Sequence, residues 1–224
     1  MIKRPSAISA LLSFNGGFVD TAGFLGLQGL FTAHVTGNFV TLAAALISGT
    51  HGVIGKLLAL PEFVIVVAAA RLLGAALRAR SLPARQVLLI AKVGCLLAFF
   101  VLAVAFGPFP DSDAPAALCT AFAGIAGMAI QNAVQRVHFS SLPPTTLMTG
   151  NTTQAVLDGV DLVSGATGAD AGAMHARLRR TLWSIFWFAL GCALAAGLYY
   201  LVGFWCLALP VAVGAATVIL REDV

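Results

Sequence analysis

The sequence predicts an all-α membrane protein with six transmembrane helices, arranged as two inverted repeats of three that each carry a short re-entrant half-helix. Three observations lead to this fold class. The chain is very apolar, it contains six apolar stretches long enough to cross a bilayer, and a Thr-Gly-Asn triplet opens two further apolar stretches that are too short to cross. The first observation identifies the class of protein, the second gives the number of crossings, and the third indicates the repeat.

The composition is that of a membrane protein. Of the 224 residues, 59% are hydrophobic and 10% are charged, and the mean hydropathy is +0.95. A soluble domain carries roughly 25% charged residues, so this chain has too few charges to cover a surface that faces water. The net charge of +4 does not indicate nucleic-acid binding, because the basic residues gather at the ends of apolar stretches, where topology and anionic lipid explain them.

Six stretches reach the length of about 20 apolar residues that a helix needs to cross the hydrocarbon core. They are residues 7–30, 57–77, 87–106, 116–137, 182–202 and 204–220. The first stretch follows Lys3 and Arg4, as in a signal peptide, but its apolar run exceeds the core of about 7–15 residues that such peptides carry. We therefore expect this stretch to be the first transmembrane helix.

Two apolar stretches, 38–48 and 151–163, are too short to cross and begin at the same triplet. The triplets are Thr36-Gly37-Asn38 and Thr149-Gly150-Asn151. Residues of these types favour a helix start, because their side chains and backbone can satisfy the first N–H groups of a helix. Each stretch is therefore predicted to be a half-helix.

The similarity between the two halves extends beyond the triplets. Residues 31–38 align with residues 145–151, and fainter similarities upstream and downstream keep the same order. Each half consists of a long helix, a short helix and two further long helices. The sequence therefore predicts two repeats, residues 1–107 and 108–224, each with three crossings and one half-helix.

The positions of Lys and Arg indicate that the half-helices do not cross. With re-entrant half-helices and a cytoplasmic N-terminus, the basic loops fall in the cytoplasm and the loop with Asp111 and Asp113 falls outside. These loops contain Arg78, Arg80, Arg85, Arg136, Arg177, Arg179, Arg180 and Arg221. If both half-helices crossed, loop 78–85 would face outside, against the positive-inside rule. Only Lys56 departs from the re-entrant topology, which places both termini in the cytoplasm.

An odd number of crossings in each half makes the two repeats inverted, which is a recurring plan of secondary transporters. Geometry allows the half-helices to turn back, because six extended residues reach about 20 Å at about 3.3 Å each. That distance exceeds half of a hydrocarbon core about 30 Å thick. Irregular backbone at this depth is tolerated only where protein or a wet cavity surrounds it, so we expect a cavity at the midplane.

We expect the two half-helix starts to meet near the membrane centre and to form a solute site. Their free N–H groups and positive dipole ends favour an anion. The expected substrate-binding residues are Thr36, Gly37, Asn38, Thr149, Gly150, Asn151, Gln131 and Asn132. Two alternatives stay open: the triplets only cap and pack the half-helices, and Gln131 and Asn132 only join helices by hydrogen bonds.

Asp20 and His34 are the candidates for coupling to protons. Asp20 lies in the middle of the first span, where an ionised carboxylate costs at least ~2.5–3.5 kcal/mol, and His34 lies on the first dip and titrates near neutral pH. Each residue also has a structural interpretation, in which it holds helices or backbone in place. Arg71 could pair with Asp20 or extend toward the cytoplasm. We expect Asp158 and Asp161 to be solvated at the end of the second half-helix.

Several of these segments together resemble the YoaK family of bacterial multi-pass inner-membrane proteins. They are Gly16-Gly17-Phe18-Val19-Asp20, residues 31–38, Gln131-Asn132 and Met148-Thr149-Gly150-Asn151. The resemblance covers most of the chain and implies a location in the bacterial inner membrane, but it supplies no substrate. A dip followed by a half-helix is also similar, in architecture alone, to nucleobase and sulfate transporters. Because this chain is much smaller than those transporters, a homodimer is a further expectation.

The leading hypothesis is a secondary transporter or permease for a small polar solute, with an anion among the options. Its expected partners are membrane lipid and the solute, without nucleic acid, metal or cofactor. The second hypothesis is an intramembrane enzyme, which would need a nucleophile with a base or a metal cluster, and the sequence shows no such motif. The third is a structural membrane subunit without transport, which a dry and closed midplane would favour.

Overall fold

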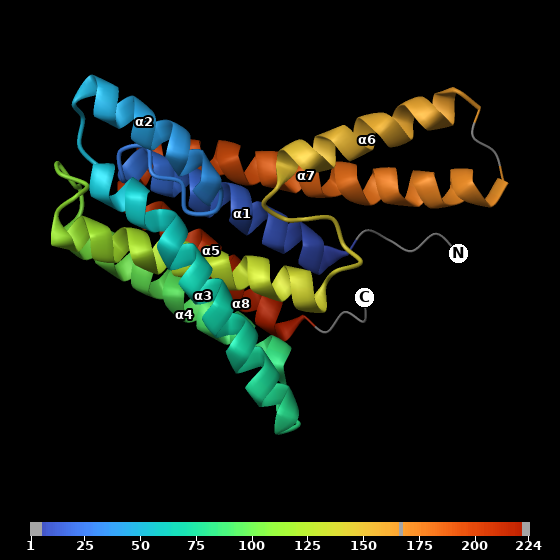
Figure 1. Cartoon of the computed structure of the whole chain (residues 1–224), viewed down its shortest axis with the longest axis horizontal. Helices are drawn as coiled ribbons and strands as arrows, with labels where there is room; N and C mark the ends of the chain where they lie inside the picture. Colours follow the sequence, from blue (N-terminus) through green and yellow to red (C-terminus); the bar gives the residue numbers. More distant parts are fainter. Residues whose placement is uncertain (1–5, 166–167, 221–224) are drawn as a thin grey trace.

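The computed structural model describes residues 6–165 and 168–220, and these residues form α-helices and short 3-10 turns without any strand (Figure 1). The helices are α1 (Ala7–Gly26), α2 (Asn38–Ser48), α3 (Val53–Ala79), α4 (Ala84–Phe106), α5 (Pro115–His138), α6 (Met148–Val163), α7 (Gly168–Val202) and α8 (Ala208–Ile219). The 3-10 turns are Val35–Gly37, before α2, and Gly203–Leu207, between α7 and α8. The predicted half-helix 38–48 therefore matches α2, whereas α6 begins three residues before the predicted stretch 151–163.

Five helical segments are long and apolar enough to cross a membrane, which indicates an integral membrane protein. They are α1, α3, α4, α5 and the continuous segment Ala171–Ile219. Most of α1 (78%) and α5 (67%) is buried inside the protein, against 22% for α3 and 33% for α4. The helices α1 and α5 therefore form the centre of the bundle, while α3 and α4 present apolar surface outward.

The last predicted span, residues 204–220, is not a single long helix. Its first residues form a 3-10 turn, and α8 has 12 residues, which corresponds to about 18 Å at 1.5 Å per residue. That length is shorter than a hydrocarbon core about 30 Å thick. The preceding helix α7 has 35 residues and begins well before the predicted start at residue 182.

One end of the bundle, which we call the acidic end, contains the loops 27–30, 49–52 and 107–114. Gln28 Nε2 donates to the carbonyls of Phe109 (3.1 Å) and Pro110 (2.9 Å). The Asp113 carboxylate accepts the N–H groups of residues 52–55 at 2.9–3.1 Å, at the start of α3. Lys56, the exception to the charge rule, is buried here and donates to the Gln28 carbonyl at 2.9 Å. Its ammonium is therefore used to hold two loops together.

The opposite end, which we call the basic end, contains the turn 80–83 and the loop 139–147. The Arg85 guanidinium lies over the ring of Phe139, 5.9 Å from its centroid. Ile8 at the start of α1 and Leu88 at the start of α4 share an apolar cluster with Phe139. The start of α1, the start of α4 and the end of α5 therefore lie together.

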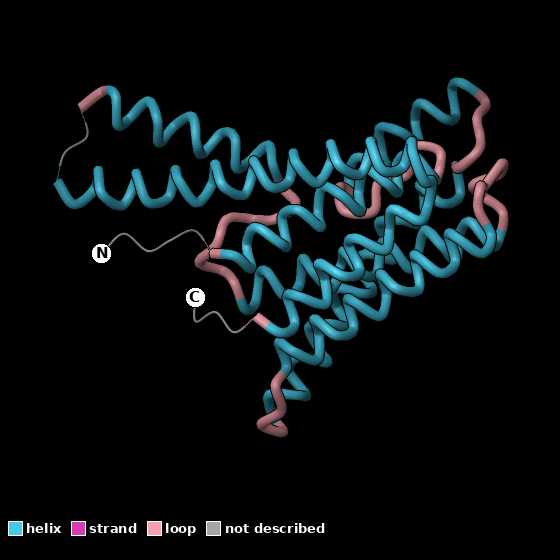
Figure 2. Tube along the Cα trace, turned by 180° about the vertical axis from the view of Figure 1, so that it is seen from behind, coloured by secondary structure: helices cyan, strands magenta, loops and turns pink. Residues whose placement is uncertain are grey.

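The segment between α1 and α3 turns back within the bundle instead of crossing it. The residues that follow α1 and those that follow α2 both lie at the acidic end, because Gln28 contacts Phe109 and Gly52 contacts Asp113. In Figure 1, α2 runs back along α3 from a start beside the middle of α1. Figure 2 shows α6 extending away from the bundle on the side where α1 begins.

Small residues allow α1 and α7 to pack closely. A Cβ on Gly17 would lie 2.1 Å from the Phe188 carbonyl oxygen, and one on Gly191 would lie 2.3 Å from the Phe14 carbonyl oxygen. Such contacts leave no room for a methyl group, as is common between membrane helices. The remaining helix pairs in extensive contact are α1–α8, α3–α5, α4–α5, α2–α3, α6–α7 and α4–α8.

Candidate functional site

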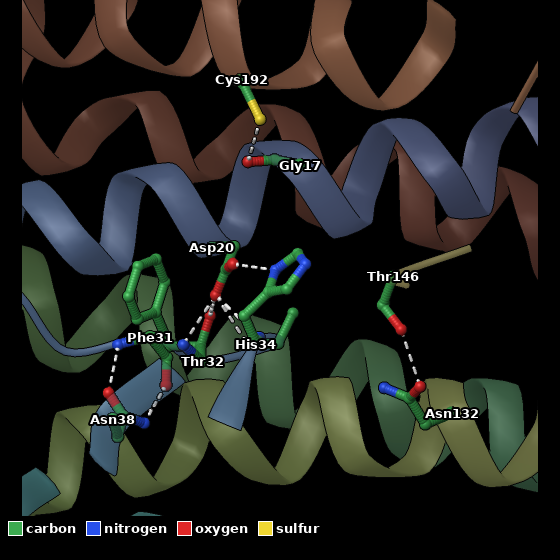
Figure 3. A network of polar contacts seen from close by, with 10 residues as sticks. Gly17, Asp20, Phe31, Thr32, His34, Asn38, Asn132, Thr146 and Cys192 are labelled. Atoms are coloured by element: carbon green, nitrogen blue, oxygen red, sulfur yellow. Dashed lines mark hydrogen bonds and ion pairs between the residues drawn. The ribbon is translucent and has the colours of Figure 1, made fainter. Parts of the chain in front are cut away.

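The first dip, residues 31–37, is held by the carboxylate of Asp20 in the middle of α1 (Figure 3). Asp20 Oδ1 accepts the backbone N–H groups of Thr32 (2.8 Å), Ala33 (2.7 Å) and His34 (3.3 Å). The side chain is buried, with 4% of the residue exposed. The carboxylate thereby satisfies three successive backbone N–H groups that no regular secondary structure pairs, as buried backbone requires. Asp20 therefore holds the backbone of the first dip in place. A role in proton coupling would have to act through these same hydrogen bonds.

His34 completes the network and extends it to a cavity. Its Nδ1 lies 2.6 Å from Asp20 Oδ2. Because a carboxylate oxygen is an acceptor, Nδ1 carries the proton, which leaves Nε2 to accept a hydrogen bond or to bind a second proton. The His34 side chain is 33% exposed, whereas that of Asp20 is 6% exposed. His34 is thus the more accessible member of the pair. The pairing of Arg71 with Asp20, which the sequence left open, is not formed among the described residues.

Asn38 fastens the dip on itself. Its Oδ1 accepts the Phe31 N–H and its Nδ2 donates to the Phe31 carbonyl, both at 2.8 Å (Figure 3). The expectation that the triplet side chains cap the half-helices is therefore wrong, since neither α2 nor α6 has a side-chain hydrogen bond at its N-cap. An amide that faces backward closes the loop instead of capping the helix.

The second dip, residues 144–147 before α6, repeats part of this geometry with neutral groups. Asn151 Nδ2 donates to the carbonyl of Pro144 at 2.7 Å, seven residues earlier, as Asn38 does to Phe31. Asn132 Oδ1 accepts the Thr146 hydroxyl at 2.8 Å, fourteen residues later, the separation that also joins Asp20 to His34. The separation of fourteen residues is therefore shared, but the groups differ, because Asp20 pairs with a histidine ring and Asn132 with a threonine hydroxyl. The correspondence between Asp20 and the Gln131-Asn132 pair stays a prediction.

Gln131 links the second dip to α1. Its Nε2 donates to the Leu12 carbonyl at 2.8 Å and to the Thr145 hydroxyl at 3.2 Å. A Cβ on Gly16 would lie 2.7 Å from the Thr145 carbonyl oxygen. The two dips therefore contact α1 about one turn apart, the second at Gly16 and the first at Asp20.

A cavity of about 390 Å³ lies between the first dip and the helices α3 and α5. His34 and Thr36 of the first dip, Leu147 of the second, and Asn132 line it, together with Arg71 of α3 and Arg136 of α5. None of the lining residues is acidic. Within the described part of the chain, neither guanidinium has an ion-pair partner. The cavity is therefore positively charged, and Arg136, which the sequence indicated only as a topology signal, belongs to it.

A second and more open hollow, of about 480 Å³, lies on the other side of His34. Asp20, Gly37, Phe188 and Cys192 contribute to its lining, and both His34 and Thr36 also border it. His34 and Thr36 thus stand between two cavities.

The second triplet does not join these cavities. Thr149 lines a separate hollow on the surface of α6, with Thr152 and Thr153, and Gly150 is exposed. Asn38 and Asn151 are buried and bonded to backbone. Of the eight expected substrate-binding residues, the structure places Thr36 and Asn132 in the central cavity and Gly37 in the neighbouring hollow. The expected meeting of two half-helix starts in one pocket is therefore replaced by a cavity at the first dip.

Residues 8–220 match the family described as "Protein of unknown function (DUF1275)". The chain belongs to this family. No curated protein and no solved structure matches the chain. Family membership supplies no substrate, and the YoaK resemblance stays a prediction.

In this DUF1275 chain, the half-helix α6 is fastened to α7 by an ion pair. Asp158 is 1% exposed, and its Oδ2 accepts Arg177 Nε at 2.8 Å. The expectation that Asp158 is solvated is therefore wrong, because the carboxylate faces α7, whereas Asp161 is exposed as predicted. The Arg177 guanidinium holds the pKa of Asp158 below its usual range. Among the residues that the structure describes, no group of three metal-ligating side chains lies together.

Proposed function

We propose that the protein is a secondary transporter or permease for a small anionic solute. The observation that carries this proposal is the cavity at the first dip, where no lining residue is acidic and neither Arg71 nor Arg136 has an ion-pair partner among the described residues. Guanidinium groups bind carboxylates and phosphates through paired N–H donors. Both arginines are exposed, and two such cations beside a solute-sized space favour an anion. The Asn132 amide, the Thr36 hydroxyl and His34 Nε2 supply neutral hydrogen-bonding groups.

The proposal includes the inverted repeat, residues 1–107 and 108–224, with six crossings and both termini in the cytoplasm of the bacterial inner membrane. The helix contacts support it, because they pair as an inverted repeat requires. The contact α1–α7 corresponds to α5–α3, α1–α8 to α5–α4, and α2–α3 to α6–α7. The sixth crossing would then be made by the 3-10 turn Gly203–Leu207 together with α8.

In this topology the basic end faces the cytoplasm and the cavity is reached from that side. Arg71 and Arg136 precede the ends of α3 and α5, which lie at the basic end. A solute would then pass from these cations to His34 and Thr36, which also border the second hollow. We therefore place His34 between the cavity and the second hollow on the path of the solute.

The test uses the purified full chain in detergent and a panel of a monocarboxylate, a dicarboxylate and inorganic phosphate. An anion that binds the folded state raises the melting temperature as its concentration increases. We expect at least one of these anions to do so for the wild type, and not for Arg71→Gln or Arg136→Gln. Arg80→Gln, at the end of α3 and outside the cavity lining, is the matched control and keeps the effect.

The same anion is then offered to proteoliposomes. Uptake above that of empty liposomes, lost in both cavity variants and kept in Arg80→Gln, supports the transporter. Binding without uptake would favour a structural subunit with an anion site. No stabilisation by any anion would contradict the proposed function.

A further inference from the structure

The middle of α4 contains a lysine that the anion cavity does not use. Lys92 has none of its surface exposed, and its Nζ has no hydrogen-bond partner among the described residues. It is flanked on α4 by apolar residues and lies in the interior of an apolar span. Ionisable residues inside a membrane are costly and mark functional sites by default, so Lys92 calls for a role.

Two buried amide oxygens, on α1 and α5, have no hydrogen-bond partner among the described residues. They are Asn15 Oδ1 on α1 and Gln131 Oε1 on α5, and both residues have none of their surface exposed. Their orientation is set by the amide nitrogens, because Asn15 Nδ2 donates to the Pro210 carbonyl at 3.0 Å and Gln131 Nε2 donates to the Leu12 carbonyl. The free atoms are therefore acceptors, which a nitrogen with N–H groups would satisfy.

The helix register brings these three groups to one level. The antiparallel pair α4–α5 sets Leu96 against Gly127 and Phe99 against Gly124. One turn further along each helix, the same register sets Lys92 against Gln131. A Cβ on Gly214 of α8 would lie 3.4 Å from Asn15 Nδ2 and 3.3 Å from the Val93 side chain, so Asn15 also lies at this level of α4.

We propose that Lys92 is a proton-binding site, with Asn15 Oδ1 and Gln131 Oε1 as the acceptors of its charged form. While the core is sealed the amine is neutral, since an ammonium without a counter-ion is not stable there. When water reaches the site, the nitrogen lone pair takes one proton from hydronium and releases water. The ammonium then donates to the two amide oxygens.

This site is connected to the cavity through α5, and its coupling role rests on the proposed function. Gln131 bonds to Thr145 of the second dip, and the next residue, Asn132, lines the cavity. An anion in the cavity would compensate the charge of the Lys92 ammonium, because charges interact strongly in a medium of low dielectric constant. Because Lys92 binds a single proton, one proton would then accompany each transported anion.

The other titratable groups near α4 are few. On α3, Glu62 interacts electrostatically with Cys95, which lies one turn from Lys92 on α4. Lys56 of α3 lies at the acidic end, while Arg71 and Arg78 of α3 and Arg85 of α4 lie nearer the basic end. On α5 they are Cys119, Arg136 and His138, the 3-10 turn carries Cys206, and α8 has none. On α1 the only one is Asp20, which the first dip and His34 already use. Glu62 is therefore the alternative proton site that the test has to separate from Lys92.

The first test measures the free energy of unfolding against pH for the purified chain. If the Lys92 amine is neutral when folded and protonated when unfolded, the unfolded state binds one proton more, and stability rises with pH. The rise continues up to the ordinary range of lysine, near pH about 10.4. We expect the free energy of unfolding of Lys92→Met to lose the part of its pH dependence that corresponds to one proton. Glu62→Gln and the acidic-end variant Lys56→Met should both keep that part.

A wild-type profile that is flat above neutral pH would overturn the proton site, whether or not any variant folds. Parallel profiles for the wild type and Lys92→Met would also overturn it. If Glu62→Gln, and not Lys92→Met, loses this pH dependence, the proton would be assigned to Glu62 on α3. None of these readouts requires a transported solute.

The second test measures coupling in proteoliposomes that contain a pH-sensitive dye, with the anion that stabilises the wild type. We expect an anion gradient to move protons in the wild type and not in Lys92→Met, which still exchanges labelled for unlabelled anion. Proton movement that persists in Lys92→Met would overturn the coupling. If no anion is transported at all, the proposed function fails, and the stability profile still decides whether Lys92 binds a proton.

Discussion

The two dips have the same backbone plan and different chemistry. In the first, a buried carboxylate accepts three backbone N–H groups and pairs with His34, and Asn38 forms two hydrogen bonds with Phe31. In the second, Asn132 and Asn151 each make one hydrogen bond to the dip, and Pro144 has no N–H group that could form another. The shared geometry fixes where the chain turns back, whereas the charged groups are confined to the dip that borders the cavities.

This difference indicates that the two dips have different roles. Neutral amides are sufficient to hold an extended backbone, as the second dip shows. The additional cost of an acid and a histidine at the first dip therefore calls for a function, and His34, between two hollows, is the group that can supply one. Removing equivalent contacts in the two dips, one at a time, compares how much each contact contributes to stability.

The largest effect is expected from Asp20→Asn. It replaces an acceptor of three N–H groups by an amide and removes the partner of His34. Removing one member of a buried pair costs roughly 3–5 kcal/mol, and we expect about 3 kcal/mol because His34 is partly exposed. Asn132→Ala, at the second dip, is the matched variant and should cost about 1 kcal/mol. Equal losses in the free energy of unfolding would show that the charge is not needed to hold the dip.

The asparagines of the two triplets give the next comparison. Asn38→Ala removes two hydrogen bonds and Asn151→Ala removes one to a carbonyl. At about 1 kcal/mol for each bond, the first variant should lose about 2 kcal/mol and the second about 1 kcal/mol. Chemical unfolding in detergent measures both, and a larger loss for Asn151→Ala would contradict the assigned bonds.

The glycines of α1 test how tightly each dip packs. A Cβ on Gly16 would meet the Thr145 backbone oxygen at 2.7 Å, while one on Gly23 would meet the Thr32 methyl group at 2.8 Å. Overpacking costs typically 1–3 kcal/mol, and a backbone atom yields less than a side chain. We therefore expect Gly16→Ala to lower the melting temperature more than Gly23→Ala. Gly150→Ala has open space and serves as the control; a similar loss there would refute the packing argument.

The smallest effect concerns the half-helices. The α6 half-helix is tied to α7 by Asp158 and Arg177, and the pKa of Asp158 is lowered by that pairing. A carboxylate of lowered pKa contributes stability above its unfolded value, about 3.9, and loses it as pH falls further. The wild type should therefore lose melting temperature in acid more steeply than Asp158→Asn. Identical acid profiles would show that the pair contributes nothing to α6.

The helices and the turning points could be predicted from the sequence because they follow from length, charge and repetition. The helix at residues 38–48 is a case of this kind. The use of each side chain could not be predicted, because it depends on which way the side chain faces. Asn38 faces backward to Phe31, and Asp158 faces α7, although both were expected to face a helix start or solvent.

Two functional candidates were missed for a different reason. Lys92 lies in the middle of an apolar span, so the rule that singled out Asp20 also applies to it. Arg136 belongs to the cavity because α5 and α3 converge with the first dip, and no sequence pattern shows that convergence. The first could have been found from the sequence, and the second required the fold.

The most direct test of the account is the side of the membrane on which each half-helix ends. In a variant without native cysteines, single cysteines replace Thr50, after α2, and Ser164, after α6, with Arg80→Cys and Ser140→Cys as references. An impermeant maleimide added to intact cells should label Thr50→Cys, and should label the other three only after permeabilisation. Labelling of Ser164→Cys or Arg80→Cys in intact cells would show that a half-helix crosses the membrane, and would contradict the inverted, re-entrant arrangement on which the proposed site depends.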